Sequence, residues 1–204
     1  MADKQGAPKR RLQRPAIFVC DLQEKFRNAI WQFDKIILTT QKLLRAAQVL
    51  KVPVYVTTQN AAKLGGTVPE FAPLLSSAVC TVDKTYFSMW VPELSKYFQS
   101  SAPSEIVIVG IESHICVTQT SLDLLAAGHK VYVLADGVSS CNKEEVGIAL
   151  DRLRKEGATI TTSESWLYEC MGDAGIAEFR DVARVVKETG QDTKVALEGL
   201  LSKM

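Results

Sequence analysis

Short apolar segments alternate with longer amphipathic segments along this chain, and this alternation limits the folds that it can adopt. Six apolar segments have the length of β-strands: residues 15–23, 52–59, 78–84, 104–111, 130–140 and 158–169. Five segments between or after them place apolar residues at helical spacing: residues 33–51, 91–99, 118–127, 142–157 and 176–190. Strands that alternate with helices in this way form βαβ units, whose parallel sheet is covered by helices.

We therefore predict a three-layer α/β/α fold, with a Rossmann-like, six-stranded, mostly parallel sheet and helices on both faces. A chain of 204 residues is long enough to bury a full core within one domain. We expect this domain over residues 15–190, after a flexible basic tail over residues 1–14 and before a C-terminal tail over residues 191–204.

The net charge and the cysteine content indicate which partners and which cellular compartment to expect. The net charge of +1 gives no reason to expect nucleic acid as a partner, and we find no apolar run that would cross a bilayer or direct secretion. An odd number of cysteines without a C-x-x-C pair fits free thiols in a reducing compartment. The five cysteines are Cys20, Cys80, Cys116, Cys141 and Cys170. We expect a cytoplasmic protein without membrane contacts.

The C-terminal tripeptide offers an alternative location. Ser202-Lys203-Met204 approaches the peroxisomal address S-K-L, although Met stands where that signal has Leu. A peroxisomal location is therefore a second expectation.

Three reactive side chains follow three of the predicted strands. Asp21 ends the first strand, Lys84 ends the third, and Cys116 comes just after the fourth, where a helix begins. Ligands of parallel α/β sheets bind outside the carboxyl ends of the strands, so these side chains are expected to meet at one edge. Each residue alone is more often a cap, a surface charge or core filling, and only their conjunction indicates a site.

A carboxylate, an ammonium and a thiol are the groups that a cysteine nucleophile requires. A free thiol has a pKa of about 8.5, and both a helix N-terminus and a neighbouring lysine favour the reactive thiolate. Asp21 is placed to accept the thiol proton and return it to a leaving group. We interpret the three residues as a nucleophile with its base and a supporting cation.

Three segments also resemble the signature segments of the isochorismatase-like cysteine hydrolases, which include nicotinamidases. These segments are "FVCDLQEKF", "VDKTYFSM" and "VGIESHICVTQT". The similarity runs over residues 15–179, and a glycine at a strand end followed six residues later by the thiol is its most specific part. Within the family the chain looks most like the isochorismatase domain-containing proteins, because of residues 64–70 and the K-T-Y-F-S-M run.

The resemblance implies a catalytic triad carried by Asp21, Lys84 and Cys116. It also implies a cis peptide bond between Ile111 and Glu112, with the backbone N–H groups of Glu112 and Cys116 directed at a developing oxyanion. Cys116 would attack an amide-type carbonyl of a small molecule and form a thioester, which water would then hydrolyse. Relatives commonly form oligomers, so a homo-oligomer is expected.

Two departures from the family pattern limit which activity is carried over. Nicotinamidases of the family bind a metal through an acid and histidines after the second strand, whereas residues 57–69 here contain no histidine and no acid. We therefore expect no metal and no other cofactor in this protein. True isochorismatases of the family lack the cysteine, so Cys116 argues against isochorismate as the substrate.

Four further residues are candidates for substrate binding: Phe26, Gln59, Phe87 and Trp90. Core or surface packing is the more common role for each of the aromatic residues. Cys20 precedes Asp21 on a strand, so its side chain is expected on the opposite face from the carboxylate.

Two other function classes remain open. One is a catalytically idle relative that works as a scaffold or binding subunit. The other is a dinucleotide-dependent oxidoreductase, which ranks last because no G-x-G-x-x-G sequence follows any predicted strand.

Overall fold

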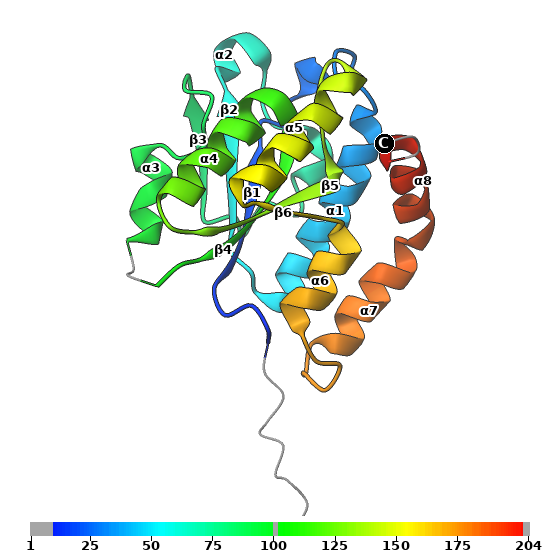
Figure 1. Ribbon diagram of the computed structural model, residues 1–204. Coiled ribbons are helices and arrows are strands. Elements are labelled where there is room, and N and C mark those ends of the chain that lie inside the picture. Colours follow the sequence, from blue (N-terminus) through cyan, green and yellow to red (C-terminus); the bar gives the residue numbers. More distant parts are fainter. Residues whose placement is uncertain (1–9, 100–101, 202–204) are drawn as a thin grey trace, which may run out of the picture.

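The computed structural model describes residues 10–99 and 102–201, and it shows a single six-stranded sheet with helices on both faces (Figure 1). The strands are β1 (Pro15–Cys20), β2 (Val54–Gln59), β3 (Cys80–Lys84), β4 (Glu105–Ile111), β5 (Lys130–Ser139) and β6 (Thr159–Thr161). They lie in the order β3-β2-β1-β4-β5-β6, and every neighbouring pair is parallel. The predicted three-layer α/β/α fold is confirmed.

The helices divide between the two faces of the sheet (Figure 1). The main helices are α1 (Phe33–Leu50), α4 (Thr118–Ala126), α5 (Lys143–Glu156), α6 (Ser163–Met171), α7 (Phe179–Glu188) and α8 (Gly190–Leu201). Shorter turns are η1 (Glu24–Phe26), α2 (Ala61–Leu64), η2 (Pro69–Phe71), α3 (Pro92–Ser95), η3 (Lys96–Phe98) and the π-helix η4 (Ser113–Val117). In the described parts of the chain, no helix is both long and apolar enough to cross a membrane.

Strand β1 is central because its side chains enter both hydrophobic cores. Ile17 and Val19 join the core under α1 and α6, while Phe18 and Cys20 join the core under α4 and α5. This alternation follows from the two-residue period of a strand, and all six residues of β1 are buried. A strand buried on both faces explains the continuous apolar run in the sequence.

The strand order reverses next to β1, which places a crevice at the carboxyl ends of β1 and β4. Gly110 of β4 lies opposite Cys20 of β1 in the parallel ladder. Its φ is +121°, and a Cβ atom built on it would lie 2.0 Å from the Cys20 carbonyl oxygen. Only glycine fits this position, because any side chain would push the two strands apart at the crevice.

Both ends of the domain differ from the tails expected from the sequence. Within residues 10–14, Leu12 is buried, and Arg10 forms an ion pair with Glu178 at 2.6 Å. At the other end, α8 continues to Leu201 because Ala196 and Leu200 are buried in the core beside α1. The basic composition of the first segment and the glycine at position 190 do not keep residues 10–14 and 191–201 from packing, because a few apolar residues are enough to bury each segment. The tripeptide over residues 202–204 lies outside the described residues.

The segment after β5 also contains more helix than expected. Only Thr159–Thr161 pairs as β6, and α6 follows directly from Ser163 to Met171. Thr162 provides the N-cap, since its side chain accepts a hydrogen bond from the Ser165 N–H.

A buried histidine couples stability to pH. His129 is 8% exposed, it packs edge-on against Trp90 and Phe98, and its Nδ1 accepts a hydrogen bond from the Ser104 N–H. Burial, with a smaller contribution from nearby Arg14, lowers the pKa of His129. The unfolded chain therefore binds the proton more readily, and stability is lost as pH falls below the unfolded pKa of about 6.5.

We expect the His129→Asn variant to lose less stability than the wild type between about pH 7.5 and about pH 5.5, on either side of that reference pKa. Asparagine keeps an acceptor for Ser104 but does not titrate. Urea unfolding midpoints at both pH values measure the difference. Identical pH dependence in the two proteins would show that His129 does not contribute.

Candidate active site

The candidate active site lies at the carboxyl ends of β1, β3 and β4. Asp21 follows β1, Lys84 is the last residue of β3, and Cys116 lies in the π-helix η4 after β4. Strand β2 separates β3 from β1, so the long Lys84 side chain reaches across β2 to the carboxylate. Lys84 Nζ lies 2.8 Å from Asp21 Oδ2, and these side chains are only 1% and 2% exposed.

Asp21 is held by both of its carboxylate oxygens. Oδ2 accepts from Lys84, and Oδ1 accepts a hydrogen bond of 2.7 Å from Thr57 Oγ1 on β2. The backbone of Asp21 has a φ of +51°, a left-handed conformation in which few residues other than glycine are found. A buried carboxylate needs such partners, since an unpaired charge at this depth is strongly destabilising.

The Lys84 ammonium is surrounded by oxygen atoms. Besides Asp21, it donates to Gln59 Oε1 at 2.8 Å and to the carbonyl oxygens of Tyr86 and Phe87 at 3.1 and 3.2 Å. Burial opposes the charged form of Lys84 and by itself would lower its pKa. The attraction of Cys20 and Asp21, the hydrogen bond to Asp21 and the attraction of Cys116 outweigh burial and raise the pKa of Lys84. The residue is therefore a fixed cation at neutral pH.

Cys116 is buried within η4, and hydrogen bonds tie its turn to the neighbouring loop. Its carbonyl oxygen accepts from Thr120 Oγ1 at 2.6 Å, and Thr120 Oγ1 in turn accepts from the Met89 N–H at 2.8 Å. The N–H groups of Ile115 and Val117, on either side of Cys116, both donate to the Glu112 carbonyl at 3.1 Å. Short π-helical turns of this kind are frequent at functional sites.

The turn that leads into η4 contains an unusual peptide bond. The bond between Ile111 and Glu112 is cis, and it is the only cis bond found among the described residues. It lies between Gly110 and the π-helix that carries Cys116.

Cys20 is a member of this cluster that the sequence analysis assigned to the wrong place. Its thiol lies 3.7 Å from Asp21 Oδ2 and within hydrogen-bonding reach of Cys116. Burial first, and then the hydrogen bond to Cys116 and the charge of Asp21, raise the pKa of Cys20 well above its usual value. The alternation rule fails here because strand geometry ends at Cys20 and Asp21 turns into the left-handed region.

Gln59 contacts the lysine rather than open space. Its Oε1 accepts from Lys84, and its Nε2 donates to the Thr85 carbonyl at 2.9 Å. Both ends of the amide are thus occupied by the protein. The amide joins Lys84 to the segment after β3, and the substrate contact expected of Gln59 stays a prediction.

The three aromatic candidates lie in different surroundings. Phe26 is half-buried and packs against the core under α1. Phe87 is 51% exposed, and its own backbone carbonyl accepts the hydrogen bond from Lys84. Trp90 packs on Phe98, with ring centroids 5.6 Å apart, and lines a cavity of about 580 Å³. Lys84 borders this cavity, but among its described lining residues there is neither Asp21 nor Cys116. Trp90 packs against the core under α4 and α5, to which Cys116 belongs, and the substrate contact expected of Trp90 stays a prediction.

The remaining three thiols are kept protonated by their surroundings. Burial raises the pKa of Cys80, and it raises that of Cys170 to about 11. Cys141 is exposed, and a hydrogen bond to Glu112 is the main cause that raises its pKa. These environments weaken the reactivity of the thiols outside the candidate site.

Comparison with known families matches most of the chain. The model of the isochorismatase domain matches residues 15–165. The secreted isochorismatase effector Isc1 of Phytophthora sojae is 42% identical over 176 residues, which cover 84% of each chain. Isochorismatase domain-containing protein 2 of Xenopus laevis is 40% identical over 187 residues, covering 91% of this chain and 87% of the relative.

Solved structures show the same architecture. A structure described as the MAR1 ribonuclease of Caenorhabditis elegans superposes with a TM-score of 0.80 at 38% identity, covering 85% of this chain and 90% of the other. A cysteine hydrolase from Pseudomonas syringae pv. phaseolicola has a TM-score of 0.71 at 19% identity, over 81% of this chain and 95% of the other. At that identity the likeness concerns the fold alone.

Proposed function

The chain belongs to the isochorismatase domain family, and from this premise we propose that it is a cysteine hydrolase acting on a C–N bond of a small amide-type molecule. The observation that carries the proposal is the buried Lys84–Asp21 ion pair beside the Cys116 thiol. A buried ion pair is a poor way to stabilise a core, since well-packed apolar residues of similar volume do so at least as well. A catalytic use for the carboxylate accounts for its presence.

In the proposed first step, Asp21 takes the thiol proton while Cys116 sulfur attacks the substrate carbonyl carbon. The carbonyl oxygen becomes an oxyanion, which the N–H groups of Glu112 and Cys116 stabilise. As the C–N bond breaks, Asp21 returns the proton to the departing nitrogen, and an acyl thioester remains on Cys116. The Lys84 ammonium holds Asp21 in place and attracts the thiolate.

In the second step, Asp21 takes a proton from water, whose oxygen attacks the thioester carbonyl. The carbon–sulfur bond breaks, the acid leaves, and Cys116 regains its proton from Asp21. The sum of both steps is hydrolysis of the amide to an acid and an amine. We assign no metal and no organic cofactor to either step, because the chain's own groups supply every proton and electron pair.

Substrate contacts beyond the reacting atoms follow from the surroundings of the site. We propose that Phe87 and Phe26 provide apolar walls for the substrate and that Gln59 acts through Lys84. Trp90 packs on Phe98 and His129 and lines the cavity that Lys84 borders, and we propose it as a further aromatic contact for the substrate. We also propose that the protein works as a homo-oligomer in the cytoplasm, with large apolar side chains such as Tyr86 and Ile148 exposed for packing against another copy.

Differential alkylation tests whether the site holds an activated thiol. In a short treatment with iodoacetamide near neutral pH, we expect Cys116 to be modified before the four other cysteines. The raised pKa of Cys20, Cys80, Cys141 and Cys170 keeps those sulfurs in the unreactive thiol form. Intact-mass and peptide mass spectrometry measure the order of modification.

Two variants show whether the fast labelling comes from Cys116 and depends on Asp21. Cys116→Ala should lose the fast adduct, and Asp21→Asn should slow it because the base that accepts the thiol proton is gone. If Cys141, the exposed thiol, reacts as fast as Cys116, the result would favour a catalytically idle scaffold.

A further inference from the structure

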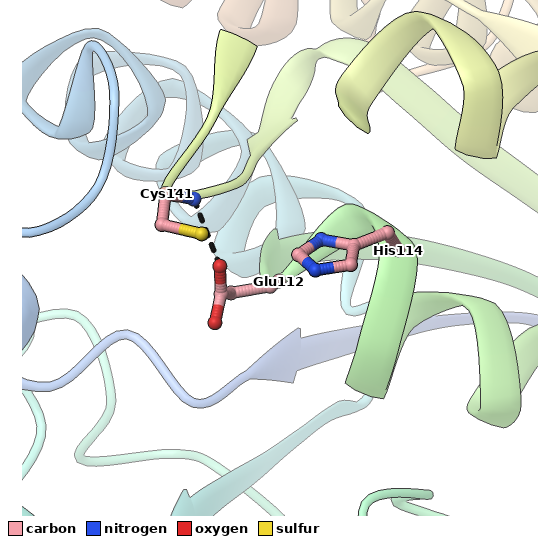
Figure 2. Close-up of side chains that lie close together, drawn as sticks. All are labelled: Glu112, His114 and Cys141. Atoms are coloured by element: carbon pink, nitrogen blue, oxygen red, sulfur yellow. Dashed lines mark hydrogen bonds between the residues drawn. The ribbon is translucent and has the colours of Figure 1, made fainter. Parts of the chain in front are cut away.

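Three metal-binding side chains meet outside the Asp21–Lys84 pair. Glu112 lies between β4 and η4, His114 lies in η4, and Cys141 lies in the segment between β5 and α5 (Figure 2). One carboxylate oxygen, one imidazole nitrogen and the thiol sulfur all lie within 4.8 Å of one another. Glu112 and His114 are half-buried, and Cys141 is exposed, so the cluster is open to solvent on one side.

The chemistry of this set selects among metal ions. Sulfur and imidazole are poor ligands for Mg²⁺ and Ca²⁺, which prefer oxygen, whereas Zn²⁺ binds thiolate, imidazole and carboxylate together. Three protein ligands and one water complete a tetrahedral zinc site. We propose that Glu112, His114 and Cys141 bind one Zn²⁺ ion, with water in the fourth position.

Hydrogen bonds already orient two of the three ligands. The Cys141 N–H donates to Glu112 Oε2 at 2.8 Å, and His114 Nδ1 lies 3.0 Å from Ser140 Oγ. Partners of this kind fix the direction of a ligand before the metal arrives and are common around protein metal sites. Because Ser140 and Cys141 are adjacent in the chain, one short segment holds both the imidazole and the carboxylate in place.

The charges of the cluster favour a divalent cation. The Glu112 carboxylate lies beside the Cys141 thiol, so a negative charge already stands next to the sulfur. On binding, the S–H bond breaks, the proton passes to solvent, and sulfur bonds to Zn²⁺. A carboxylate, a thiolate and a neutral imidazole then carry a total charge that balances the ion.

This site is separate from the metal position of the nicotinamidases, which lies after the second strand. Residues 57–69 contain no histidine and no acid, and Glu112 and His114 follow β4 whereas Cys141 follows β5. The proposed ion also lies next to the peptide bond that precedes the proposed oxyanion donor. Bound zinc would therefore restrain the turn that carries the Glu112 N–H.

Cobalt and zinc titrations of the full chain, purified without a metal-binding tag, test the proposal directly. Co²⁺ is expected to produce the near-ultraviolet charge-transfer absorption of a cobalt–thiolate bond, and one equivalent of Zn²⁺ should displace it. The Cys141→Ser variant should lose the band, and His114→Gln should weaken Zn²⁺ binding by at least about 10- to 100-fold, the loss seen when an outer-shell partner of a metal is removed. Zinc should also raise the melting temperature of the wild type but not of Cys141→Ser.

Two control variants separate this site from the thiols of Cys80 and Cys116. Cys80→Ser, which removes a half-buried cysteine elsewhere, should bind both metals as the wild type does. Cys116→Ala should also keep the cobalt band. The proposal is overturned if Cys141→Ser binds as tightly as the wild type, if no cobalt–thiolate band forms, or if the band disappears in Cys116→Ala. None of these readings depends on turnover, so they stand apart from the proposed hydrolase function.

Discussion

Replacing Lys84 with Met is expected to lower the free energy of unfolding by about 3–5 kcal/mol, the usual cost of removing one partner of a buried ion pair. The variant leaves the Asp21 carboxylate buried without its cation, and the side chains of both residues are at most 2% exposed in the wild type. The midpoint of urea unfolding measures the loss. Hydrolytic activity should fall as well, because the carboxylate loses the ammonium that holds it in place.

Two comparison variants show whether burial of the ion pair causes the loss of stability in Lys84→Met. In Asp21→Asn/Lys84→Met both charges are gone, so we expect this double variant to be more stable than Lys84→Met alone. Lys35 pairs with Asp34 at the same distance of 2.8 Å, but the Asp34 side chain is 66% exposed. Lys35→Met should therefore cost only about 0–1 kcal/mol. Equal losses at Lys84 and Lys35 would contradict a special role for the buried pair.

Replacing Cys116 with Ala is expected to reduce hydrolysis by about 10³-fold or more, as in other enzymes that lose the nucleophile of a triad. The reason is that no sulfur remains to form the acyl thioester. A panel of small amides, acylated metabolites and isochorismate should first identify a substrate with the wild type. The initial rates of both proteins on that substrate then give the ratio.

An acid-quenched reaction adds a direct readout. The wild type should show an acyl mass on the peptide that contains Cys116, and the variant should show none. Cys80→Ser serves as the matched thiol control and should retain full activity, since Cys80 is half-buried on β3 and only packs against the core under α4 and α5. Activity that survives in Cys116→Ala would exclude the covalent route.

The names of the relatives indicate which other substrates to test. Isc1 is named as an isochorismatase and the Caenorhabditis structure as a ribonuclease. Neither name determines the substrate of this chain. The net charge of +1 gives no general attraction for a polyanion, and a thiol nucleophile suits an acyl carbon better than a vinyl ether. RNA and isochorismate belong in the panel as competing outcomes.

The arrangement of the sheet was predictable because burial on two faces produces a recognisable pattern of apolar residues within each segment. Strands such as β1 are continuous apolar runs, and α1 and α5 repeat their apolar residues at helical spacing. The ends of the domain were harder to predict. Leu12 is a single apolar residue in a basic segment, and the buried residues of α8 keep helical spacing but include a threonine and an alanine: Thr193, Ala196 and Leu200. Their burial depends on partners in α1 and the rest of the core.

Sequence alone determined that Asp21, Lys84 and Cys116 follow three strands of one parallel sheet, since periodicity and strand direction are local properties of the chain. Tertiary structure alone decided the contacts at those ends. The left-handed backbone of Asp21 brings Cys20 beside the carboxylate, and the reach of Lys84 across β2 engages Gln59.

The meeting of Glu112 and His114 with Cys141 likewise depends on how β4 and β5 lie side by side. Such contacts join residues from different strands, so no pattern within a single segment encodes them. They arise only when the whole core has closed around the sheet.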